Sequence, residues 1–375
     1  MTVTKNRWYI PPPSTMFKRK TSVHFLPFSL ILFGLILALG GCLNREKVPS
    51  PAVPKSIIPP SSATLRVAVT DSGLGGLSVV AHLEKRLAQE KSYEKVEIIF
   101  VNALFSSQGG YNSLPHRRTK IEIFSSALES LAKKYQPDLI FVGCNTLSVL
   151  LPETSFIQHS SLPVVSIVDS ALKLMAEALR QHPEACLIIF GTPTTISEGT
   201  YVRRLIEQGF LSERIISQAC PELEIYIERG FDQEETAWLI QGYVEEALQK
   251  LPDQKTPIIA SLNCTHYGYA QNFWQKALEA SGHELVALLN PNETMIDCLF
   301  LPQLKNRFPD SQIKIRVVSM IPFSEEVINS ISRALQAISP QTAQALKNYE
   351  LVPHLFEWRK FLSPPPQPQE ETSTT

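Results

Sequence analysis

The chain alternates short apolar runs with longer amphipathic stretches, and this alternation restricts the fold more than any other feature. The expected strands are Leu65–Thr70, Val96–Asn102, Asp138–Gly143, Val164–Val168, Cys186–Gly191, Arg214–Ala219, Pro257–Leu262, Glu284–Leu289 and Ile313–Val318. The expected helices lie between them, for example at Gly75–Glu90, His116–Tyr135, Ser170–Gln181 and Glu234–Leu251. Strand–helix alternation of this kind is typical of parallel sheets that carry helices on both faces.

Two of these runs end in a cysteine motif. The motifs read Leu-Ile-Phe-Val-Gly-Cys144-Asn145-Thr146 and Ile-Ile-Ala-Ser-Leu-Asn-Cys264-Thr265-His266-Tyr267. Open α/β sheets bind ligands at the carboxyl ends of their strands, so each motif brings a thiol to a ligand-binding edge. The two cysteines are 120 residues apart, and each is followed by a polar turn and a helix. This faint internal repeat predicts an α/β fold with two pseudo-symmetric, doubly wound parallel-sheet domains and the site in the cleft between them.

Composition narrows the function classes. A length of 375 residues with 44% apolar residues is enough for two domains. The formal net charge is −1 and no basic stripe is present, so we expect no nucleic-acid partner. The six cysteines have neither Cys-x-x-Cys spacing nor a dense disulfide pattern, so we expect no metal site. Buried cysteines are usually inert, and we expect Cys186, Cys220 and Cys298 to be core residues.

The N-terminal segment is expected to be a targeting signal rather than part of the fold. A basic stretch at 18–20 precedes an uncharged stretch at 25–41, which ends in Leu-Gly-Gly-Cys42. This pattern resembles a bacterial lipoprotein signal in which Cys42 is lipidated, with Met16 as an alternative start. Positive charge on the amino side predicts that the rest of the chain lies outside the cytoplasm, lipid-anchored at the cell envelope. An uncleaved membrane anchor and an intracellular chain with an apolar leader remain alternatives.

The resulting organisation has six parts. We expect a signal peptide with its lipobox at 1–42, a Pro/Ser-rich tether at 43–63, the first part of one α/β domain at 64–166, a second α/β domain at 167–284, a return segment of the first domain at 285–345, and a C-terminal extension with a disordered Pro-rich tail at 346–375. Segments rich in proline and serine without apolar periodicity are typical of extended tethers and disordered tails.

The turn after the first expected strand is rich in glycine. It reads Asp71-Ser72-Gly73-Leu74-Gly75-Gly76-Leu77-Ser78. Glycines allow a tight turn and a close approach of ligand to backbone, and the amides at the start of the following helix suit an anion such as a carboxylate. A nucleotide phosphate loop is the alternative, but the spacing is neither Gly-x-Gly-x-x-Gly nor a Walker pattern.

Taken in order, these motifs resemble glutamate racemase and the wider aspartate/glutamate racemase superfamily. The matching segments are the glycine-rich turn, Cys144-Asn145-Thr146-x-Ser148, Gly191-Thr192-Pro193-x-Thr195, Gly199-Thr200-Tyr201, Cys220-Pro221 leading to Glu228, and Cys264-Thr265-His266-Tyr267. The resemblance covers roughly Leu65 to Ile338. In that family the product D-amino acid serves cell-wall (peptidoglycan) biogenesis.

The resemblance implies an isomerase that moves a proton at the α-carbon of an acidic amino acid without a cofactor or metal. Cys144 and Cys264 are the expected acid/base pair, Asp71 and His266 their supporting groups, and Glu228 a further acidic residue of the site. A free thiol has a pKa of about 8.5, so thiol and thiolate can coexist near neutral pH. The expected substrate-binding residues are Asp71, Ser72, Gln108, Gly109, Cys144, Asn145, Thr146, Thr192, Thr195, Cys264, Thr265 and His266.

The chain departs from the family pattern at three places. A Pro-Tyr-Gly turn whose amides hold a carboxylate is replaced by Ser107-Gln108-Gly109, a glutamate-proline pair by Asp169-Ser170, and an Asp-Ser pair by Asn290-Pro291. Proton transfer at carbon is therefore better supported than glutamate as the substrate, with aspartate as the other candidate. The alternative function is a non-catalytic lipoprotein that binds acidic amino acids. A decarboxylase or cis/trans isomerase of the same superfamily ranks below both, and the oligomeric state stays open, with a homodimer as one option.

Overall fold

The computed structural model describes residues 61–253 and 255–362. The lipobox with Cys42, nearly all of the tether at 43–63 and the Pro-rich tail from Ser363 onward lie outside the described residues. Across the described ranges, none of the helices combines the length and the hydropathy that a membrane span requires.

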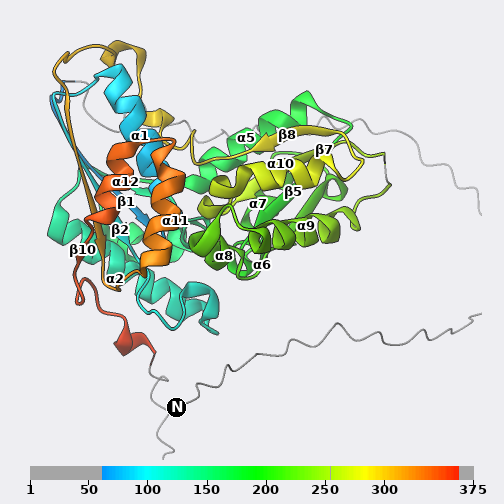
Figure 1. Cartoon of the computed structure of the whole chain (residues 1–375), viewed down its shortest axis with the longest axis horizontal. Coiled ribbons are helices and arrows are strands. Elements are labelled where there is room, and N and C mark those ends of the chain that lie inside the picture. Colours follow the sequence, from blue (N-terminus) through cyan, green and yellow to red (C-terminus); the bar gives the residue numbers. More distant parts are fainter. Residues whose placement is uncertain (1–60, 254, 363–375) are drawn as a thin grey trace, which may run out of the picture. The chain divides into compact units, whose positions relative to one another are not determined.

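The first sheet has six parallel strands in the order β10-β9-β2-β1-β3-β4 (Figure 1). Its strands are β1 (Thr64–Asp71), β2 (Lys95–Asn102), β3 (Leu139–Val142), β4 (Val164–Ser166), β9 (Gln312–Ser319) and β10 (Glu350–Leu351). Successive residues of β1 enter different cores, with Val67 and Val69 in one and Ala68 in the other, because side chains alternate across a sheet.

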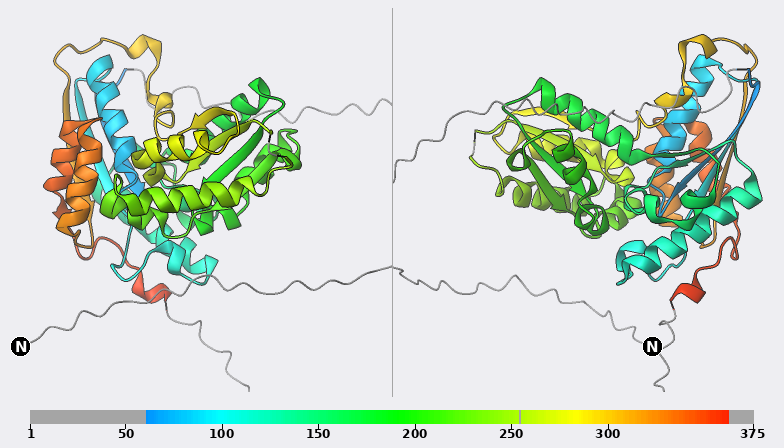
Figure 2. Two further views of the ribbon diagram at one scale, coloured as in Figure 1. Left: turned by 45° about the vertical axis from the view of Figure 1, so that its right-hand side comes forward. Right: turned by 180° about the vertical axis from the view of Figure 1, so that it is seen from behind.

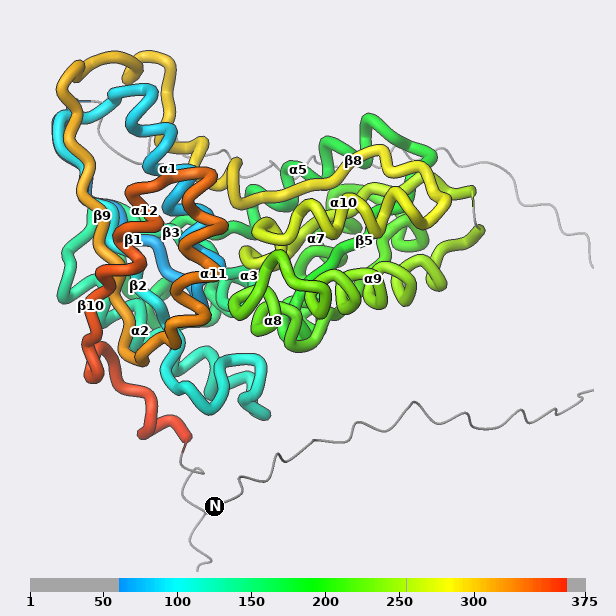
Figure 3. The backbone as a smooth tube through the Cα atoms, in the orientation of Figure 1, coloured from blue at the N-terminus to red at the C-terminus, as the bar shows by residue number. Residues whose placement is uncertain are grey.

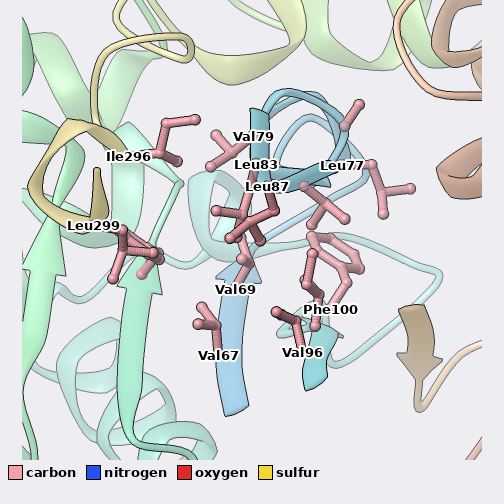
Figure 4. Packing of buried hydrophobic residues seen from close by; sticks show 14 of the residues in the cluster. Val67, Val69, Leu77, Val79, Leu83, Leu87, Val96, Phe100, Ile296 and Leu299 are labelled. Atoms are coloured by element: carbon pink, nitrogen blue, oxygen red, sulfur yellow. The ribbon is translucent and has the colours of Figure 1, made fainter. Parts of the chain in front are cut away.

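Helices cover both faces of this sheet. The helices α1 (Leu77–Glu90), α11 (Glu325–Gln336) and α12 (Pro340–Lys347) pack on one face, and α2 (Arg117–Tyr135) and α4 (Ser155–His159) pack on the other (Figure 2). Figure 4 shows the first of these cores, where Leu83 and Leu87 of α1 lie over Val67 and Val69. Ile296 and Leu299 close the same core from the segment after the second sheet.

The second sheet has four parallel strands in the order β6-β5-β7-β8. They are β5 (Cys186–Gly191), β6 (Ile215–Ala219), β7 (Ile258–Asn263) and β8 (Leu285–Leu289). One face packs against α8 (Leu223–Gly230), α9 (Glu234–Leu248) and α10 (Gln271–Glu279), and the other against α5 (Ile167–Gln181) and α7 (Thr200–Glu207). The prediction of two parallel-sheet α/β domains is therefore confirmed.

Several element bounds differ from the sequence prediction for local reasons. The helix after β4 begins at Ile167 rather than Ser170, because the Ser166 hydroxyl caps it by accepting a hydrogen bond from the Val168 amide. Strand β8 pairs with β7, so the second sheet continues to Leu289, past the expected domain end at residue 284. The extension after residue 345 contributes the short edge strand β10, which pairs with β9.

Candidate active site

The candidate site gathers at the carboxyl ends of strands from both sheets. Asp71 ends β1 beside Asn102 at the end of β2, with which it is in register. Cys144 directly follows the short turn after β3, and Cys264 directly follows β7. Both thiols line one cavity of about 610 Å³. Figure 3 shows the two elements that bound it, α3 (Asn145–Ser148) from the first sheet and α8 from the second.

Cys144 lies at the N-cap of α3 and is 4% exposed. Its Sγ accepts a hydrogen bond from the Leu147 amide at 3.4 Å and lies 3.1 Å from Ser72 Oγ. Burial raises the pKa of the Cys144 thiol well above its usual value, and the nearby charge of Asp71 raises it further. The hydrogen bonds from Ser72 and Leu147 lower this pKa only in part, so Cys144 is a neutral thiol in the free protein.

Cys264 is 6% exposed, and its Sγ lies 3.6 Å from Nδ1 of His266. Burial raises the pKa of this thiol as well, with a further rise from the charge of Glu224. The other ring nitrogen of His266, Nε2, donates a hydrogen bond to Glu228 Oε1 at 2.8 Å. A carboxylate only accepts, so this bond places a ring proton on Nε2 and leaves Nδ1 to accept a proton from Cys264.

The charge state of His266 depends on Glu228. Burial on its own lowers the pKa of His266, but the hydrogen bond and charge of Glu228, together with Asp71, raise it above its ordinary value. Glu228 Oε1 also accepts a hydrogen bond from the Leu74 amide at 2.8 Å. The glycine-rich turn of the first sheet is therefore joined directly to the His266–Glu228 pair of the second.

Asp71 makes a second connection between the halves. It is buried, and its Oδ2 accepts a hydrogen bond from Thr265 Oγ1 at 2.7 Å. Burial raises the pKa of Asp71 above its usual value, while the positive charge of His266 and the hydrogen bond from Thr265 act in the opposite direction. A buried carboxyl group with a raised pKa is suited to exchanging protons with a neighbouring thiol.

Gly75 is required where the two halves meet. A Cβ atom added at Gly75 would lie 2.3 Å from Thr265 Oγ1 and 2.7 Å from the backbone nitrogen of His266. Distances this short have no room for a side chain. The glycine-rich turn predicted to let a ligand approach the backbone therefore also lets the second cysteine motif approach the first.

Hydroxyl and amide side chains complete the cavity. Thr146 Oγ1 and Thr192 Oγ1 lie 2.8 Å apart, and Tyr201 donates a hydrogen bond to Asn145 Oδ1 at 2.5 Å. The structure brings every predicted site residue to the cavity wall except Thr195, which lies behind Thr192 and hydrogen bonds to it at 3.0 Å. Thr195 is therefore placed to support Thr192 rather than to touch a ligand.

Other cavity residues have no clear signal in the sequence. Tyr111 and Asn112 come from the 3-10 helix η1 (Tyr111–Ser113), and Glu224 comes from the first turn of α8. Asn292 holds the second motif in place, since its Nδ2 donates a hydrogen bond to the Thr265 carbonyl at 2.9 Å. A polar loop residue or an acid on an amphipathic helix looks the same in sequence whether it faces solvent or a cavity.

The remaining cysteines lie away from this cavity wall. Cys186 and Cys220 belong to a core of the second sheet, and Cys298 packs against a core of the first. All five cysteines in the described part of the chain are free thiols. Within residues 61–253 and 255–362, no group of His, Cys, Asp and Glu side chains has the arrangement of a metal site.

Comparison with known proteins gives consistent relatives. No family model matches the sequence. The chain is 28% identical over 207 residues to a glutamate racemase of Aquifex pyrophilus, covering 54% of this chain and 71% of that protein. It is 26% identical over 232 residues to a glutamate racemase of Lysinibacillus sphaericus, covering 62% and 79% respectively.

Solved structures show the same fold. The glutamate racemase of Francisella tularensis in complex with D-glutamate superposes with a TM-score of 0.58 and 19% identity, covering 77% of this chain and 97% of that one. A glutamate racemase of Bacillus anthracis gives a TM-score of 0.56 and 21% identity, covering 80% and 100%. The chain is thus similar in sequence to glutamate racemases and shares their two-sheet fold, and together these findings support its place in the racemase family.

Proposed function

We propose that this protein is a cofactor-independent racemase of acidic amino acids, with glutamate as its first substrate and aspartate as the second. Cys144 and Cys264 are the two acid/base groups. The observation that carries the proposal is that two buried thiols, one from each sheet, line the same cavity and that each has its own proton-exchanging neighbour.

The reaction moves one proton on each face of the α-carbon. One cysteine, as the thiolate, takes the α-proton, and the other, as the thiol, gives its proton to the opposite face, so the carbon inverts and the total number of protons is unchanged. Since burial keeps both thiols neutral in the free protein, the thiolate forms when the substrate ammonium group enters the cavity, because its positive charge stabilises the sulfur anion.

Different groups hold the proton displaced from each thiol. On the first side, the buried Asp71 carboxylate takes the proton of Cys144. On the second side, Nδ1 of His266 takes the proton of Cys264, and Glu228 stabilises the imidazolium ion that results. Asp71 and His266 therefore act on the thiols, while Glu228 is a positioning residue that acts through His266.

Glutamate is supported by the relatives rather than by any single contact in the cavity. The sequence relatives are named glutamate racemases, and the Francisella tularensis structure contains D-glutamate. Hydroxyl and amide groups of Ser72, Asn145 and Thr146 line the cavity next to Cys144, and they are suited to hold ammonium and carboxylate groups.

The test is hydrogen exchange at the α-carbon. The full-length reduced protein is incubated with L- or D-glutamate, or with L- or D-aspartate, in deuterated water, and deuterium incorporation and chirality are followed by NMR and chiral chromatography. We expect α-deuteration together with inversion, and loss of racemisation in Cys144→Ser and Cys264→Ser with unchanged circular dichroism. Full racemisation by Cys264→Ser would refute the two-thiol assignment.

A second candidate function is supported by the raised pKa of both thiols. A binding protein that keeps its thiols neutral would capture acidic amino acids without chemistry. It predicts that glutamate raises the melting temperature of the protein while its α-hydrogen does not exchange with deuterated water. The same incubation therefore separates the two functions.

We further propose lipid anchoring at Cys42, on the basis of sequence alone, with the domain outside the cytoplasm. Expressed in a bacterial host, the wild-type chain should fractionate with membranes and incorporate a labelled fatty acid. The Cys42→Ser variant should do neither. Recovery of unlabelled wild-type protein in the soluble fraction would contradict the anchor.

A further inference from the structure

Three residues of the cavity wall carry polar atoms that lack a hydrogen-bond partner among the described residues. These atoms are Tyr111 Oη, Asn112 Oδ1 and Glu224 Oε2, and each is fully buried. Buried polar atoms are nearly always hydrogen bonded, because leaving one unpaired costs free energy. Unpaired atoms that share one cavity therefore indicate the place where a ligand supplies the missing partners.

Asn112 and Glu224 form a pair across the cavity. Asn112 belongs to the segment after β2 in the first sheet, and Glu224 to α8 of the second. The Asn112 Nδ2 group donates a hydrogen bond to Glu224 Oε1 at 3.0 Å. This bond fixes the orientation of both side chains and leaves one oxygen of each, Asn112 Oδ1 and Glu224 Oε2, for a ligand.

The surroundings of Glu224 favour a carboxyl group that keeps its proton. The titratable groups whose charges interact with Glu224 are Glu228 on its own helix, Cys264, His266 and Tyr267 after β7, Cys220 after β6, and Tyr243 on α9. His266 is the only cation among them, and its Nε2 is already bonded to Glu228. Burial raises the pKa of Glu224 above its usual value, although His266 and Asn112 lower it in part.

The pair is separate from the groups that hold the thiols. The Cys144 thiol contacts Ser72 and the Leu147 amide, and the Cys264 thiol contacts His266. None of the described hydrogen bonds of Glu224 or Asn112 reaches either sulfur. If the α-carbon sits between the thiols, the Asn112–Glu224 pair is available to the far end of the substrate.

We propose that Asn112 and Glu224 select the substrate by binding its side-chain carboxyl group, with one proton shared between that group and Glu224. The inference rests on the proposed racemase function and names the residues that recognise its acidic substrate. No covalent bond is made or broken, and the shared proton is either already on Glu224 or is taken up from solvent as the substrate binds. Without that proton two carboxylates would face each other and repel.

The shared proton gives a pH dependence with a definite sign. The pKa of Glu224 is higher in the complex than in the free protein, so affinity for glutamate is full at low pH and falls as pH rises toward the pKa of the complex. Over that interval KM should rise up to about tenfold per pH unit. Glutamine can donate its amide hydrogens to ionised Glu224, so its KM should not rise in this way.

The experiment compares the full-length wild-type protein with Glu224→Gln. KM and kcat for α-hydrogen exchange are measured with glutamate and with glutamine at several pH values between 6 and 9. We expect the wild-type KM for glutamate to rise with pH, and the KM of Glu224→Gln to be flat because its amide donates without titrating. Glu235→Gln, which removes an exposed carboxylate from α9, is the matched control and should keep the wild-type slope.

Calorimetry tests the inference independently of turnover. Heats of glutamate binding are measured near neutral pH in two buffers with different ionisation enthalpies, which reports proton uptake. Uptake by the wild-type protein that disappears in Glu224→Gln supports the shared proton, even if no α-hydrogen exchange occurs and the racemase function fails. An unchanged KM slope in Glu224→Gln, a lower wild-type KM for glutamine at every pH, or equal proton uptake in both proteins would overturn it.

Discussion

Cys144 and Cys264 both follow a fully buried strand at the carboxyl edge of a parallel sheet, yet their neighbours differ. Cys144 has a hydroxyl, a backbone amide and the Asp71 carboxyl group around it. Cys264 has the imidazole of His266, which is backed by Glu228. One half of the site thus stores a proton on a carboxyl group and the other on a histidine, so the pseudo-symmetry of the fold does not extend to its acid/base chemistry.

The largest effect expected from this comparison is the separation of the two half-reactions. Cys144→Ser and Cys264→Ser should each lower racemisation by about a thousandfold or more, because each removes a general acid/base group. Each variant keeps one thiol, so each should still exchange the α-hydrogen of one enantiomer slowly with deuterated water, without inversion. NMR with separate L- and D-glutamate samples measures this exchange.

The two variants serve as controls for each other. Cys144→Ser should exchange one enantiomer and Cys264→Ser the other, because the two thiols flank opposite faces of the α-carbon. Exchange of the same enantiomer by both would mean that a single base serves both directions, and the comparison between the halves would fail. Cys220→Ser, in a core outside the cavity, should retain wild-type exchange of both enantiomers.

A smaller effect is expected from the His266–Glu228 pair, which belongs to the Cys264 half alone. His266→Asn should lower kcat/KM about a hundredfold. Since racemisation has an equilibrium constant of 1, kcat/KM must fall equally in both directions. The asymmetry appears instead in the primary deuterium isotope effect, which should increase for the enantiomer that loses its proton to Cys264.

Glu228→Gln separates positioning from packing at this pair. The hydrogen bond and charge of Glu228 raise the pKa of His266, so their removal lowers it, and the imidazole stays neutral down to a lower pH. The acid limb of the pH profile of kcat/KM should therefore move to lower pH, with a loss of about tenfold in rate. An acid limb that stays at the wild-type pH would show that Glu228 does not act through His266.

The sequence allowed much of this arrangement to be predicted. Continuous apolar runs such as 139–142 and 258–263 are typical of parallel strands buried on both faces, so the strand ends, and hence both thiols, could be located. Asp71, Ser72, Thr265 and His266 adjoin those strand ends directly, and the structure brings them to the cavity. Pattern and chain connectivity were sufficient for these residues.

Residues that reach the site from elsewhere could not be predicted in this way. Glu224 occupies the first turn of α8, where an acidic residue is favourable next to the helix dipole whether or not it faces a ligand. Asn112 lies in the segment after β2 and acquires its role only through the hydrogen bond across the cavity. Thr195 matched a motif but lies one layer too deep, because the Thr192 side chain caps α6 (Pro193–Ser197) in front of it.

A moderate effect is expected where the two halves touch. Gly75→Ala would place a methyl group against Thr265 Oγ1 and the His266 amide, and the cost of such overpacking is about 1–3 kcal/mol. Urea unfolding measures this loss, and KM for glutamate should rise because the two motifs move apart. Gly242→Ala on α9 is the matched control, since nothing lies within 4 Å of its added Cβ, and it should gain about 0.5–1 kcal/mol.

The smallest effect is expected at the C-terminal segment, which supports the Cys144 half of the site from behind. The Trp358 ring lies 5.1 Å from the Phe105 ring, and Phe105 lies 5.2 Å from Tyr111 in the cavity wall. Trp358→Ala removes the outer member of this chain of rings, so the segment that carries Gln108 and Asn112 should be held less firmly. We expect KM for glutamate to rise about threefold with kcat unchanged, since aromatic pairs of this kind contribute about 0.5–1.5 kcal/mol.

Leu362→Ala, at an exposed apolar residue four positions further along the chain, is the control and should leave KM unchanged. If Trp358→Ala lowers kcat rather than raising KM, the ring chain acts on the thiol of Cys144 and not on substrate binding. If it lowers the free energy of unfolding but leaves both constants unchanged, the C-terminal segment stabilises the first sheet only. The Cys264 half has no equivalent support, because its wall is formed by α8 and α9 packed directly on the second sheet.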